Sequence, residues 1–265
     1  MTRSVTALGA LLLAAALGGC GLFKDKEDLK KEWTAADFYK AAKEEFDLHN
    51  WEPAIKLYEQ LEAKFPFGRF AQQAQIEVAY AYYKQGETAQ AITALDKFIK
   101  LHPNHANVDY ALYLKALANF KEDLGPFANL VRQDLADRDP KAARESFEGF
   151  KELVTRFPES RYAADARERM AYLVEALARH EINVAKYYLA RGAYLAAANR
   201  AQDSIVRFPN SPAHKDALDI MIEAYDRMGM KELRDDTKRV LAKNFPADPL
   251  GQQGRNRTGS WWKFW

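Results

Sequence analysis

Few side chains in the sequence could carry covalent or metal chemistry. His102 and His105 lie three residues apart and could supply two metal ligands, but Pro103 breaks the helix that would align them and no nearby cysteine offers a third ligand. We therefore interpret them as residues on the surface of a turn. The sequence contains no glycine-rich phosphate loop, nucleophile elbow or metalloprotease helix. These observations argue against an enzyme and against a bound metal.

One residue remains whose position predicts a covalent modification, the single cysteine Cys20. It follows an apolar run, residues 5–17, that is too short to span a bilayer with its flanks, and then two glycines. This pattern resembles a bacterial lipobox, in which the Cys thiol receives diacylglycerol and the new N-terminus receives an acyl chain. A free or bridged thiol is the alternative. We expect residues 1–19 to be a signal peptide and residues 20–33 to be the lipidated Cys20 with a charged tether, and we expect no other cofactor.

The charge of the chain is close to balanced, with 39 Lys and Arg against 37 Asp and Glu. Because a nucleic-acid-binding surface needs an excess of cations, we do not expect nucleic acid as a partner. Hydrophobic residues make up 48% of the chain. That fraction is enough for a sizeable core without disulfide bonds.

A repeat is visible along the chain, because an aromatic residue or His precedes Pro at five places. The five pairs are Phe65–Pro66, His102–Pro103, Phe157–Pro158, Phe208–Pro209 and Phe245–Pro246. The first and last intervals lie close to the tetratricopeptide period of about 34 residues, and the two middle intervals are longer. Since Pro ends a helix, each pair is expected to close one helical hairpin.

Further positions recur at constant distances before each Pro. A small residue stands at Ala54, Ala91 and Ala197, where two helices could cross closely, and Ser146 and Arg234 occupy the same slot in two degenerate repeats. Residues suited to a hairpin turn come slightly earlier, at His49, Gly86, Gly192 and Gly229. The apolar spacing is helical throughout. The sequence therefore predicts an all-α, tetratricopeptide-type solenoid of about five helical hairpins.

The predicted organisation has two lobes, because residues 160–191 contain no Pro or Gly and should form one long helix between the third and fourth hairpins. We assign residues 34–120 to N-terminal repeats, 121–139 to a loop-like insertion and 140–246 to C-terminal repeats. Residues 247–265 form a flexible, aromatic-ended tail in this interpretation.

Five sequence strings narrow the class of repeat protein. They are Phe65-Pro66-Phe67-Gly68, residues 79–84 (AYAYYK), Asn107-Val108-Asp109-Tyr110, Asp137-Arg138-Asp139-Pro140 and residues 187–194 (YYLARGAY). Together with the lipobox they resemble the BamD (ComL) family, the lipoproteins of the machinery that folds and inserts β-barrel proteins into the outer membrane. The resemblance extends from Cys20 to about Pro246.

The resemblance implies a scaffold at the periplasmic face of the outer membrane, lipid-anchored there, with Gly21 after the cysteine fitting that location. Its N-terminal repeats would receive the C-terminal targeting segments of unfolded outer-membrane β-barrel proteins. Its C-terminal repeats would hold the periplasmic domains of BamA, the barrel-forming subunit, and other Bam lipoproteins would be further partners. The alternative is a periplasmic repeat lipoprotein that binds peptidoglycan or coordinates envelope constriction.

Site residues follow from the matching strings. Those implied for substrate binding are Phe65, Phe67, Gly68, Tyr80, Tyr82 and Tyr83, and those implied for BamA binding are Arg191, Tyr194, Asn199 and Arg200. Tyr82, Tyr83 and Tyr188 also occupy repeat positions whose usual role is hairpin core. An arginine at an exposed helix position, as we expect for Arg200, is free to pair with a partner carboxylate; a merely solvated side chain is the alternative.

The tail has its own chemistry, since four of its last five residues are aromatic: Trp261, Trp262, Phe264 and Trp265. Such an ending suits the lipid interface, and it also resembles the aromatic-terminated signal of barrel substrates. It could therefore enter the protein's own substrate groove or a groove on a partner. A tail without any partner is the competing interpretation.

Overall fold

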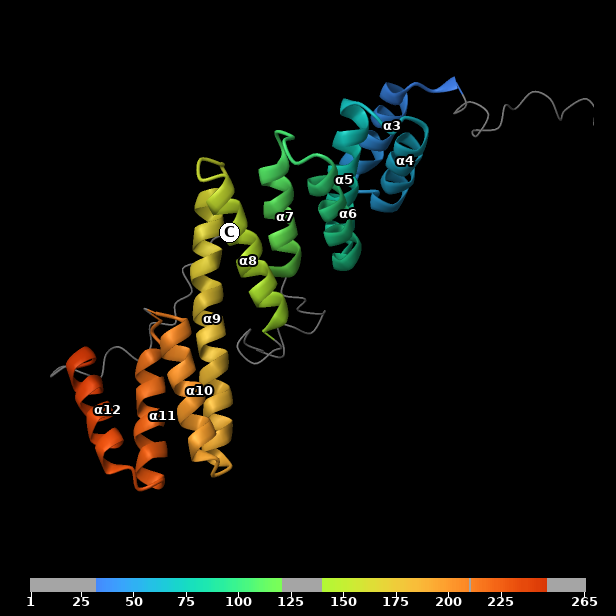
Figure 1. The fold of residues 1–265 in the computed structure, drawn as a ribbon. Coiled ribbons are helices and arrows are strands. Elements are labelled where there is room, and N and C mark those ends of the chain that lie inside the picture. Colours follow the sequence, from blue (N-terminus) through green and yellow to red (C-terminus); the bar gives the residue numbers. More distant parts are fainter. Residues whose placement is uncertain (1–31, 121–139, 210, 247–265) are drawn as a thin grey trace, which may run out of the picture. The chain divides into compact units, whose positions relative to one another are not determined.

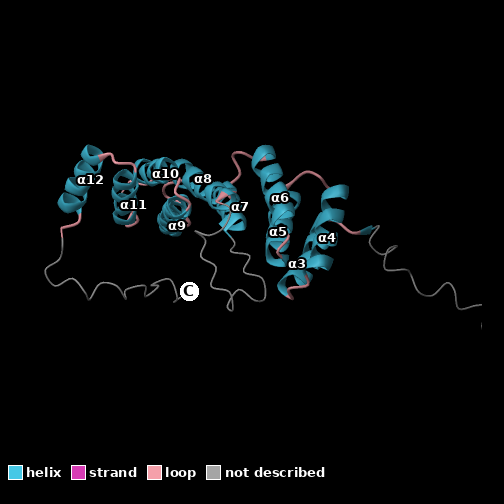
Figure 2. Cartoon of the chain, turned by 90° about the horizontal axis from the view of Figure 1, so that it is seen from below, coloured by secondary structure: helices cyan, strands magenta, loops and turns pink. Residues whose placement is uncertain are grey.

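The computed structural model describes residues 32–120, 140–209 and 211–246. This part of the chain consists of helices joined by loops and turns, and Figure 2 shows no strand in it. The helices are α3 (Ala35–Asp47), α4 (Trp51–Lys64), α5 (Arg69–Gln85), α6 (Thr88–Leu101), α7 (Val108–Phe120), α8 (Lys141–Arg156), α9 (Ala163–Ala190), α10 (Tyr194–Arg207), α11 (His214–Arg227) and α12 (Lys231–Asn244). Among these helices, none is both long and apolar enough to cross a bilayer.

The helices form five consecutive hairpins, α3/α4, α5/α6, α7/α8, α9/α10 and α11/α12 (Figure 1). Residues 1–103 and 104–265 divide into two compact units. Unit 1 contains α3 to α6 and unit 2 contains α7 to α12, and within each unit every helix packs against the next one along the chain. The predicted all-α fold of five tetratricopeptide-type hairpins is confirmed.

The long helix predicted between residues 160 and 191 is present as α9, which has 28 residues. Its two halves bury apolar side chains against different neighbours, since α9 packs on α8, α10 and α11. A continuous helix with both halves packed joins its neighbours into one body. The boundary between the two compact units lies before α7.

The helix ends follow the aromatic-Pro pairs. The helices α4, α6, α8, α10 and α12 all end one residue before the aromatic residue or His of the pair. At that aromatic residue or His, φ lies between -124° and -131° and ψ between 56° and 68°. These angles are outside the helical region because the proline ring clashes with a helical residue in front of it. The N–H of each end residue still donates to the carbonyl four residues back, so the last turn remains closed.

The turns inside the hairpins also match the predicted positions. Gly86 ends α5 with φ 86°, a left-handed conformation that costs glycine nothing. His49 takes the same role in the first hairpin with φ 62°, and it is the one non-glycine residue with positive φ among those described. Its ring lies 5.1 Å from the ring of Trp51, edge to face, which helps to hold the strained turn.

Small residues allow the helices of a hairpin to cross closely. Ala54, Ala91 and Ala197 are fully buried in this position. In the third hairpin the same slot holds Ser146, whose hydroxyl donates to the carbonyl of Ala116 at 2.9 Å. The slot thus accepts a hydroxyl because the facing backbone supplies an acceptor.

Candidate functional site

The largest group of half-buried aromatic rings in unit 1 surrounds Tyr80 on α5. The centroid of the Tyr80 ring lies 5.5 Å from that of Phe46, 6.1 Å from that of Trp51 and 6.3 Å from that of Tyr83. These four residues, here called the aromatic patch, come from α3, α4 and α5, and each keeps part of its surface in solvent. Of these four residues, the sequence singled out Tyr80 and Tyr83 for substrate binding, and not Phe46 or Trp51.

Two lysines border the aromatic patch. The Lys43 ammonium lies 4.4 Å from the centroid of the Phe46 ring, and that of Lys84 lies 5.5 Å from the centroid of the Tyr80 ring. Cations over ring faces are held by the ring quadrupole while remaining open to solvent. Lys43 is also paired with Asp47 at 2.6 Å. The patch therefore offers aromatic surface with the positive charge of Lys84 at its edge, a combination suited to a peptide that carries aromatic side chains and a carboxylate.

The loop of residues 65–68 lies at the other end of α5. Phe65 packs into the core of the first hairpin, with its ring 6.4 Å from that of Phe38. Phe67, in contrast, is 91% exposed, and Gly68 begins α5 with φ 102° and open space where a Cβ would be. Of the three residues predicted here, Phe65 is mainly structural, and Phe67 and Gly68 are accessible.

Tyr82 lies on a different side of α5 from Tyr80 and Tyr83. It packs against the core of the first hairpin and lines a groove between α4, α5 and α6, and its hydroxyl donates to Glu59 at 3.3 Å. Burial and the nearby Glu59 carboxylate raise the pKa of Tyr82. The six residues predicted for substrate binding therefore do not form one site. They fall into the aromatic patch, the exposed loop and a separate groove.

A carboxylate that the sequence did not single out lies in the middle of unit 1. Glu77 on α5 is buried and accepts hydrogen bonds from the hydroxyls of Tyr39 on α3, at 2.9 Å, and Tyr58 on α4, and from the Gln73 amide at 3.2 Å. Burial, with Glu77 adding to it, raises the pKa of both tyrosines well above the usual value, so both stay protonated and remain donors. Glu77 thereby ties three helices together beneath the aromatic surface. Its signal in the sequence was a single Glu inside an otherwise uncharged run.

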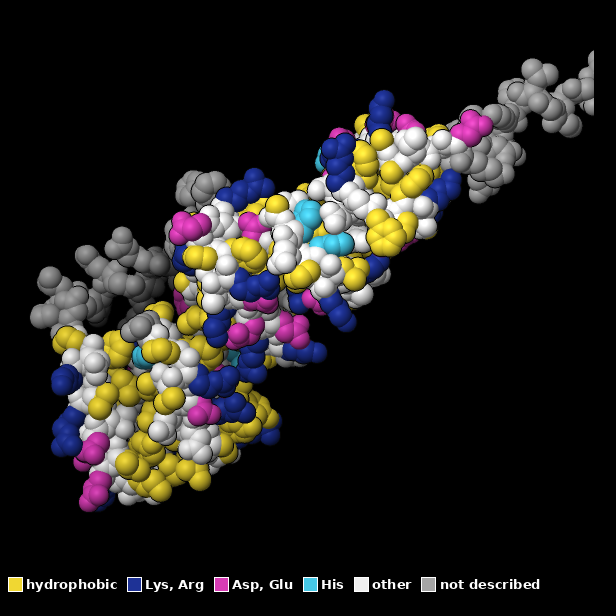
Figure 3. Space-filling view, turned by 45° about the horizontal axis from the view of Figure 1, so that its top comes forward, with side chains coloured by type: hydrophobic (Ala, Val, Ile, Leu, Met, Phe, Trp, Pro, Cys, Tyr) yellow, Lys and Arg dark blue, Asp and Glu magenta, His cyan; other side chains and the backbone are white. Residues whose placement is uncertain are grey.

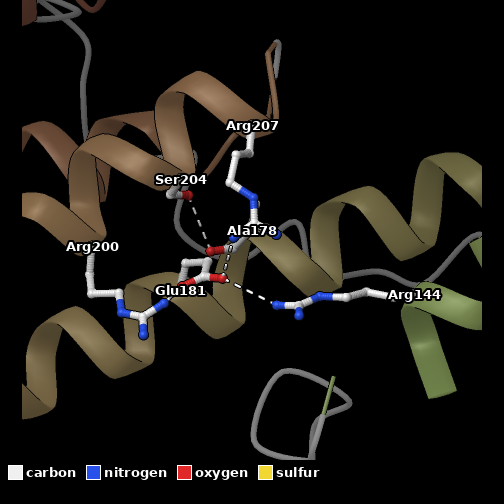
Figure 4. A network of polar contacts seen from close by, with 6 residues as sticks. All are labelled: Arg144, Ala178, Glu181, Arg200, Ser204 and Arg207. Carbon is white, nitrogen blue, oxygen red and sulfur yellow. Dashed lines mark hydrogen bonds and ion pairs between the residues drawn. The ribbon is translucent and has the colours of Figure 1, made fainter. Parts of the chain in front are cut away.

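A second buried carboxylate organises unit 2. Glu181 on α9 is 1% exposed and lies among three guanidinium groups, as Figure 4 shows. Its oxygens are 3.5 Å from Arg144 on α8, and 3.0 Å and 3.2 Å from Arg200 and Arg207 on α10. The three arginine side chains are each about half exposed, so the cluster carries an excess of positive charge that solvent or a partner can reach. Beside it, the Ser204 hydroxyl donates to the Ala178 carbonyl at 3.3 Å (Figure 4).

This arrangement corrects the expectation for Arg200. The sequence predicted either a free or a merely solvated side chain, whereas the structure pairs Arg200 with Glu181 inside the protein. One guanidinium nitrogen donates to Glu181, and the guanidinium has further N–H groups to offer. Because the partner carboxylate is nineteen positions away in sequence, on another helix, the pattern within α10 could not reveal it.

The other residues predicted for the partner side occupy two places. Arg191 and Tyr194 lie at the tip of the α9/α10 hairpin, where the Arg191 guanidinium is 5.0 Å from the centroid of the Tyr187 ring. Asn199 is exposed on α10, next to Arg200. Tyr188 belongs to the same tip, with its ring 5.8 Å from that of Tyr187. The structure thus separates a hairpin tip from the arginine cluster.

The two histidines considered as metal ligands have other contacts. Nε2 of His102 lies 3.2 Å from the Gln75 side-chain oxygen, and Nδ1 of His105 accepts the Asn107 N–H at 3.1 Å. Within the described residues, no three His, Cys, Asp or Glu side chains are grouped so as to hold a metal ion. The predicted signal peptide, the lipidated Cys20, the insertion 121–139 and the tail 247–265 lie outside the described residues.

Comparisons with known proteins give matches over most of the chain. The family model described as "YfiO: Outer membrane lipoprotein" matches residues 31–240. The "Outer membrane protein assembly factor BamD" of Neisseria meningitidis serogroup B is 47% identical over 259 residues, covering 97% of this chain and 96% of the relative. The protein of the same name from Vibrio cholerae is 32% identical over 237 residues, covering 89% of this chain and 97% of that one.

Solved structures are more distant. The TPR2AB-domain:pHSP90 complex of yeast Sti1 is 13% identical and matches 80% of this chain and 78% of its own, with a TM-score of 0.43. The crystal structure of MamA matches with a TM-score of 0.34 at 16% identity, over 79% of this chain and 88% of its own. The five hairpins seen here, and not these likenesses, define the fold.

The family matches confirm three predictions made from the sequence: the resemblance itself, the outer-membrane lipoprotein, and a binding scaffold in place of an enzyme. The family match extends over nearly all the described residues of both units, since it covers residues 31–240. The chain belongs to the BamD family of outer membrane lipoproteins, the outer membrane protein assembly factors.

Proposed function

We propose that this lipoprotein is a scaffold of the outer-membrane β-barrel assembly machinery, in which unit 1 receives unfolded barrel proteins and unit 2 binds the periplasmic domains of BamA. The name shared by its relatives, outer membrane protein assembly factor, supports the general role. Other Bam lipoproteins are further partners in this proposal. The lipid on Cys20 would hold the scaffold at the periplasmic face of the outer membrane.

The substrate role rests mainly on the accessible aromatic surface of unit 1. Phe67 is 91% exposed, and the aromatic patch adds Tyr80 and Tyr83 at the far end of α5. Aromatic rings are large and rigid, so they bind apolar side chains with little loss of conformational entropy. A targeting segment with aromatic residues could insert its side chains beside these rings, and Lys84 could attract a carboxylate.

The length of α5 fits an extended segment. Gly68 and Tyr80 are twelve positions apart, which corresponds to about 18 Å along a helix. An extended chain covers about 3.3 Å per residue, so about six residues would span both ends of α5. Because alternate side chains of such a segment point the same way, aromatic residues at every second position could contact both surfaces.

The partner role of unit 2 rests on the excess charge around Glu181. One buried carboxylate faces three arginines, and the guanidinium groups are half exposed. Glu181 holds Arg200 in place, and an arginine fixed in this way loses less entropy when it binds a second carboxylate. An acidic side chain on BamA would complete the pairing of this cluster.

The substrate role is tested with a fluorescent peptide that has the aromatic-terminated C-terminal sequence of a barrel protein. We expect Phe67→Ala to weaken binding about tenfold in an anisotropy titration, because removing a central aromatic contact typically costs 1 to 2 kcal/mol, or about that factor. Leu101→Ala is the matched control, since Leu101 is also exposed in unit 1, at the end of α6. Equal affinities of the two variants would contradict the proposed site.

The partner role is tested by tagged purification from detergent-solubilised outer membranes, with BamA identified by mass. The test variant is Arg200→Gln, which removes the positive charge. Replacement by Glu is avoided, because it would place a second carboxylate beside Glu181 and disturb the fold. Arg156→Gln is the control, since Arg156 pairs with Glu152 on its own helix. Loss of BamA with the first variant alone supports the proposal. If BamA is recovered with both variants, the interface lies elsewhere. If BamA is not recovered even with the wild type, the result favours the peptidoglycan alternative.

A further inference from the structure

The two ends of unit 1 differ in their chemistry. Because α3, α4, α5 and α6 pack in sequence and are joined by short turns, neighbouring helices run in opposite directions. The start of α3, the end of α4, the start of α5 and the end of α6 therefore lie at one end of the unit, here called the tether end. The turns at His49 and Gly86 lie at the opposite end.

Two large apolar side chains are exposed at the tether end. Phe67, in the loop before α5, is 91% exposed, and Leu101, the last residue of α6, is 55% exposed. Trp33, which is partly exposed, precedes α3 at the same end. Figure 3 shows hydrophobic side chains beside Lys and Arg side chains on the visible face of unit 1.

The repeat does not require an apolar side chain at either position. Directly after Pro, where the first hairpin has Phe67, the later hairpins have Asn104, Glu159, Asn210 and Ala247. Two residues before Pro, where the second hairpin has Leu101, the other hairpins have Lys64, Arg156, Arg207 and Asn244. Polar residues predominate at both positions, so hairpin packing does not account for Phe67 and Leu101.

The charge of the tether end is balanced. Residues 32–38, 61–72 and 98–103 contain three basic side chains and three carboxylates: Lys64, Arg69, Lys100, Glu32, Asp37 and Glu62. Two of these carboxylates have partners within the unit. Asp37 accepts from the N–H of Thr34 at 2.9 Å and from its hydroxyl at 2.7 Å, and Glu62 pairs with Lys97. The tether end thus presents basic and apolar side chains without an excess of negative charge.

The opposite end is acidic. Residues 44–54 and 82–91 contain five carboxylates against one lysine: Glu44, Glu45, Asp47, Glu52 and Glu87 against Lys84. Lysines one turn further in pair with Asp47 at 2.6 Å and with Glu52 at 2.8 Å, and an excess of negative charge remains. Leu48 is 70% exposed at this end, but its neighbours in sequence are these carboxylates.

We propose that the tether end of unit 1 lies on the phospholipid surface of the outer membrane, with Phe67 and Leu101 at the depth of the headgroups and the three basic side chains beside the phosphates. Aromatic and aliphatic side chains bordered by Lys and Arg are typical of a contact with the membrane interface. Anionic lipids attract basic side chains and repel the acidic opposite end. The inference rests on the lipid anchor at Cys20, which is part of the proposed function.

The length of chain before α3 favours this contact. Thirteen residues separate Cys20 from Trp33. A chain of that length spans about 45 Å when fully extended and about 20 Å on average as a random coil. The two ends of unit 1 are separated by the length of α5, about 25 Å. The anchor therefore brings the tether end within reach of the lipid surface without being stretched, and attachment at this range makes a weak contact sufficient.

In this arrangement the lipid on Cys20 supplies the affinity for the membrane, and the tether end sets the orientation of unit 1. The aromatic patch lies toward the opposite end, since Tyr80 and Tyr83 belong to the last two turns of α5. It would be held about 18 Å from the membrane, open to the periplasm. A substrate segment that lies along α5 would meet the membrane at Phe67, so the proposed substrate contact of this residue is compatible with its position.

The test uses the mature, acylated full chain in vesicles of phosphatidylethanolamine and phosphatidylglycerol. A fluorescent label is attached at Ala63→Cys, in the last turn of α4 at the tether end, or at Gln85→Cys, the last residue of α5 at the opposite end. Both positions are exposed, and acylation of Cys20, the single native cysteine, leaves the new thiol to react. The measured quantity is quenching of the label by lipids that carry a spin label near the headgroup.

We expect about threefold stronger quenching at residue 63 than at residue 85, because side chains of an interfacial contact enter the lipid by about 5 to 10 Å and residue 85 stays about a helix length away. The double variant Phe67→Ser, Leu101→Ser should abolish this difference. Leu48→Ser is the matched control, since Leu48 is exposed at the opposite end, and it should leave the difference unchanged.

Equal quenching of the two labels, or a difference that survives the double variant, overturns the inference and leaves the anchor intact. If the acylated chain does not float with the vesicles, the anchor at Cys20 fails and this inference fails with it. The substrate role is measured separately in the lipid-free anisotropy titration, where Leu101→Ala is expected to have no effect.

Discussion

Replacement of Glu181 by Gln tests whether one carboxylate holds three helices of unit 2 together. The carboxylate is 1% exposed and accepts from Arg144, Arg200 and Arg207 at 3.5, 3.0 and 3.2 Å. Hydrogen bonds to charged groups contribute about 1.5 to 3 kcal/mol each, but these guanidinium groups are half exposed, which reduces each contribution to about 1 kcal/mol. The Gln oxygen can still accept one bond. We therefore expect Glu181→Gln to lower the free energy of unfolding by about 2 kcal/mol.

The magnitude is checked by urea unfolding followed by circular dichroism, with hydrogen exchange of α8 to α10 showing that the loss lies in unit 2. Arg207→Gln should cost less, about 1 kcal/mol, because Glu181 keeps two of its three cations. Glu223→Gln is the control, since Glu223 forms an exposed pair with Arg227 at 3.5 Å and should cost under about 0.5 kcal/mol. The reasoning is refuted if Glu181→Gln is no more costly than Glu223→Gln.

Two other changes probe helix contacts of unit 2. A Cβ at Gly149 would lie 3.0 Å from the Cβ of Ala116 on α7. We therefore expect Gly149→Val to lower the free energy of unfolding by about 2 kcal/mol, as measured in urea. A smaller loss in the double variant Gly149→Val, Ala116→Gly would identify the clash as the cause. The hydrogen bond from Arg234 holds the pKa of Asp226 below its usual value. The contribution of this pair to stability is therefore present above the unfolded pKa, about 3.9, and is lost as pH falls through the lower folded pKa. Amide exchange in α12, corrected for its intrinsic pH dependence, should therefore accelerate below about pH 4 in the wild type. The acceleration should be smaller in Asp226→Asn, where Asp235 still accepts from Arg234 at 2.8 Å. An equal acceleration in the variant would contradict this assignment.

The ends and turns of the helices could be predicted because local chemistry decides them. Pro after Phe65, His102 and the three later aromatic residues disfavours a helical conformation at the residue before it, and all five helices end there. Gly86 adopts a positive φ for an equally local reason. The period of these signals was enough to predict the number of hairpins and the all-α class.

The candidate site was predicted less completely, since the matching strings name residues but not the side of the helix that each faces. Tyr80, Tyr82 and Tyr83 are close in sequence, yet Tyr82 packs toward α4 and α6 whereas the other two join the aromatic patch. Successive positions on a helix turn by about 100°, so proximity in sequence does not imply a common surface.

The sequence by itself determined the repeat, the helix boundaries, the family and the covalent chemistry expected at Cys20, because each depends on residues that are neighbours along the chain. Tertiary structure alone decided which donors the buried carboxylates meet. Glu77 and Glu181 are unremarkable in the sequence, and they became central when packing removed them from water and brought in donors from other helices. A buried carboxylate must find such donors, since its desolvation would otherwise cost several kcal/mol, on the order of what a whole domain has to spare. Those long-range pairings hold α3, α4 and α5 together in unit 1, and α8, α9 and α10 in unit 2.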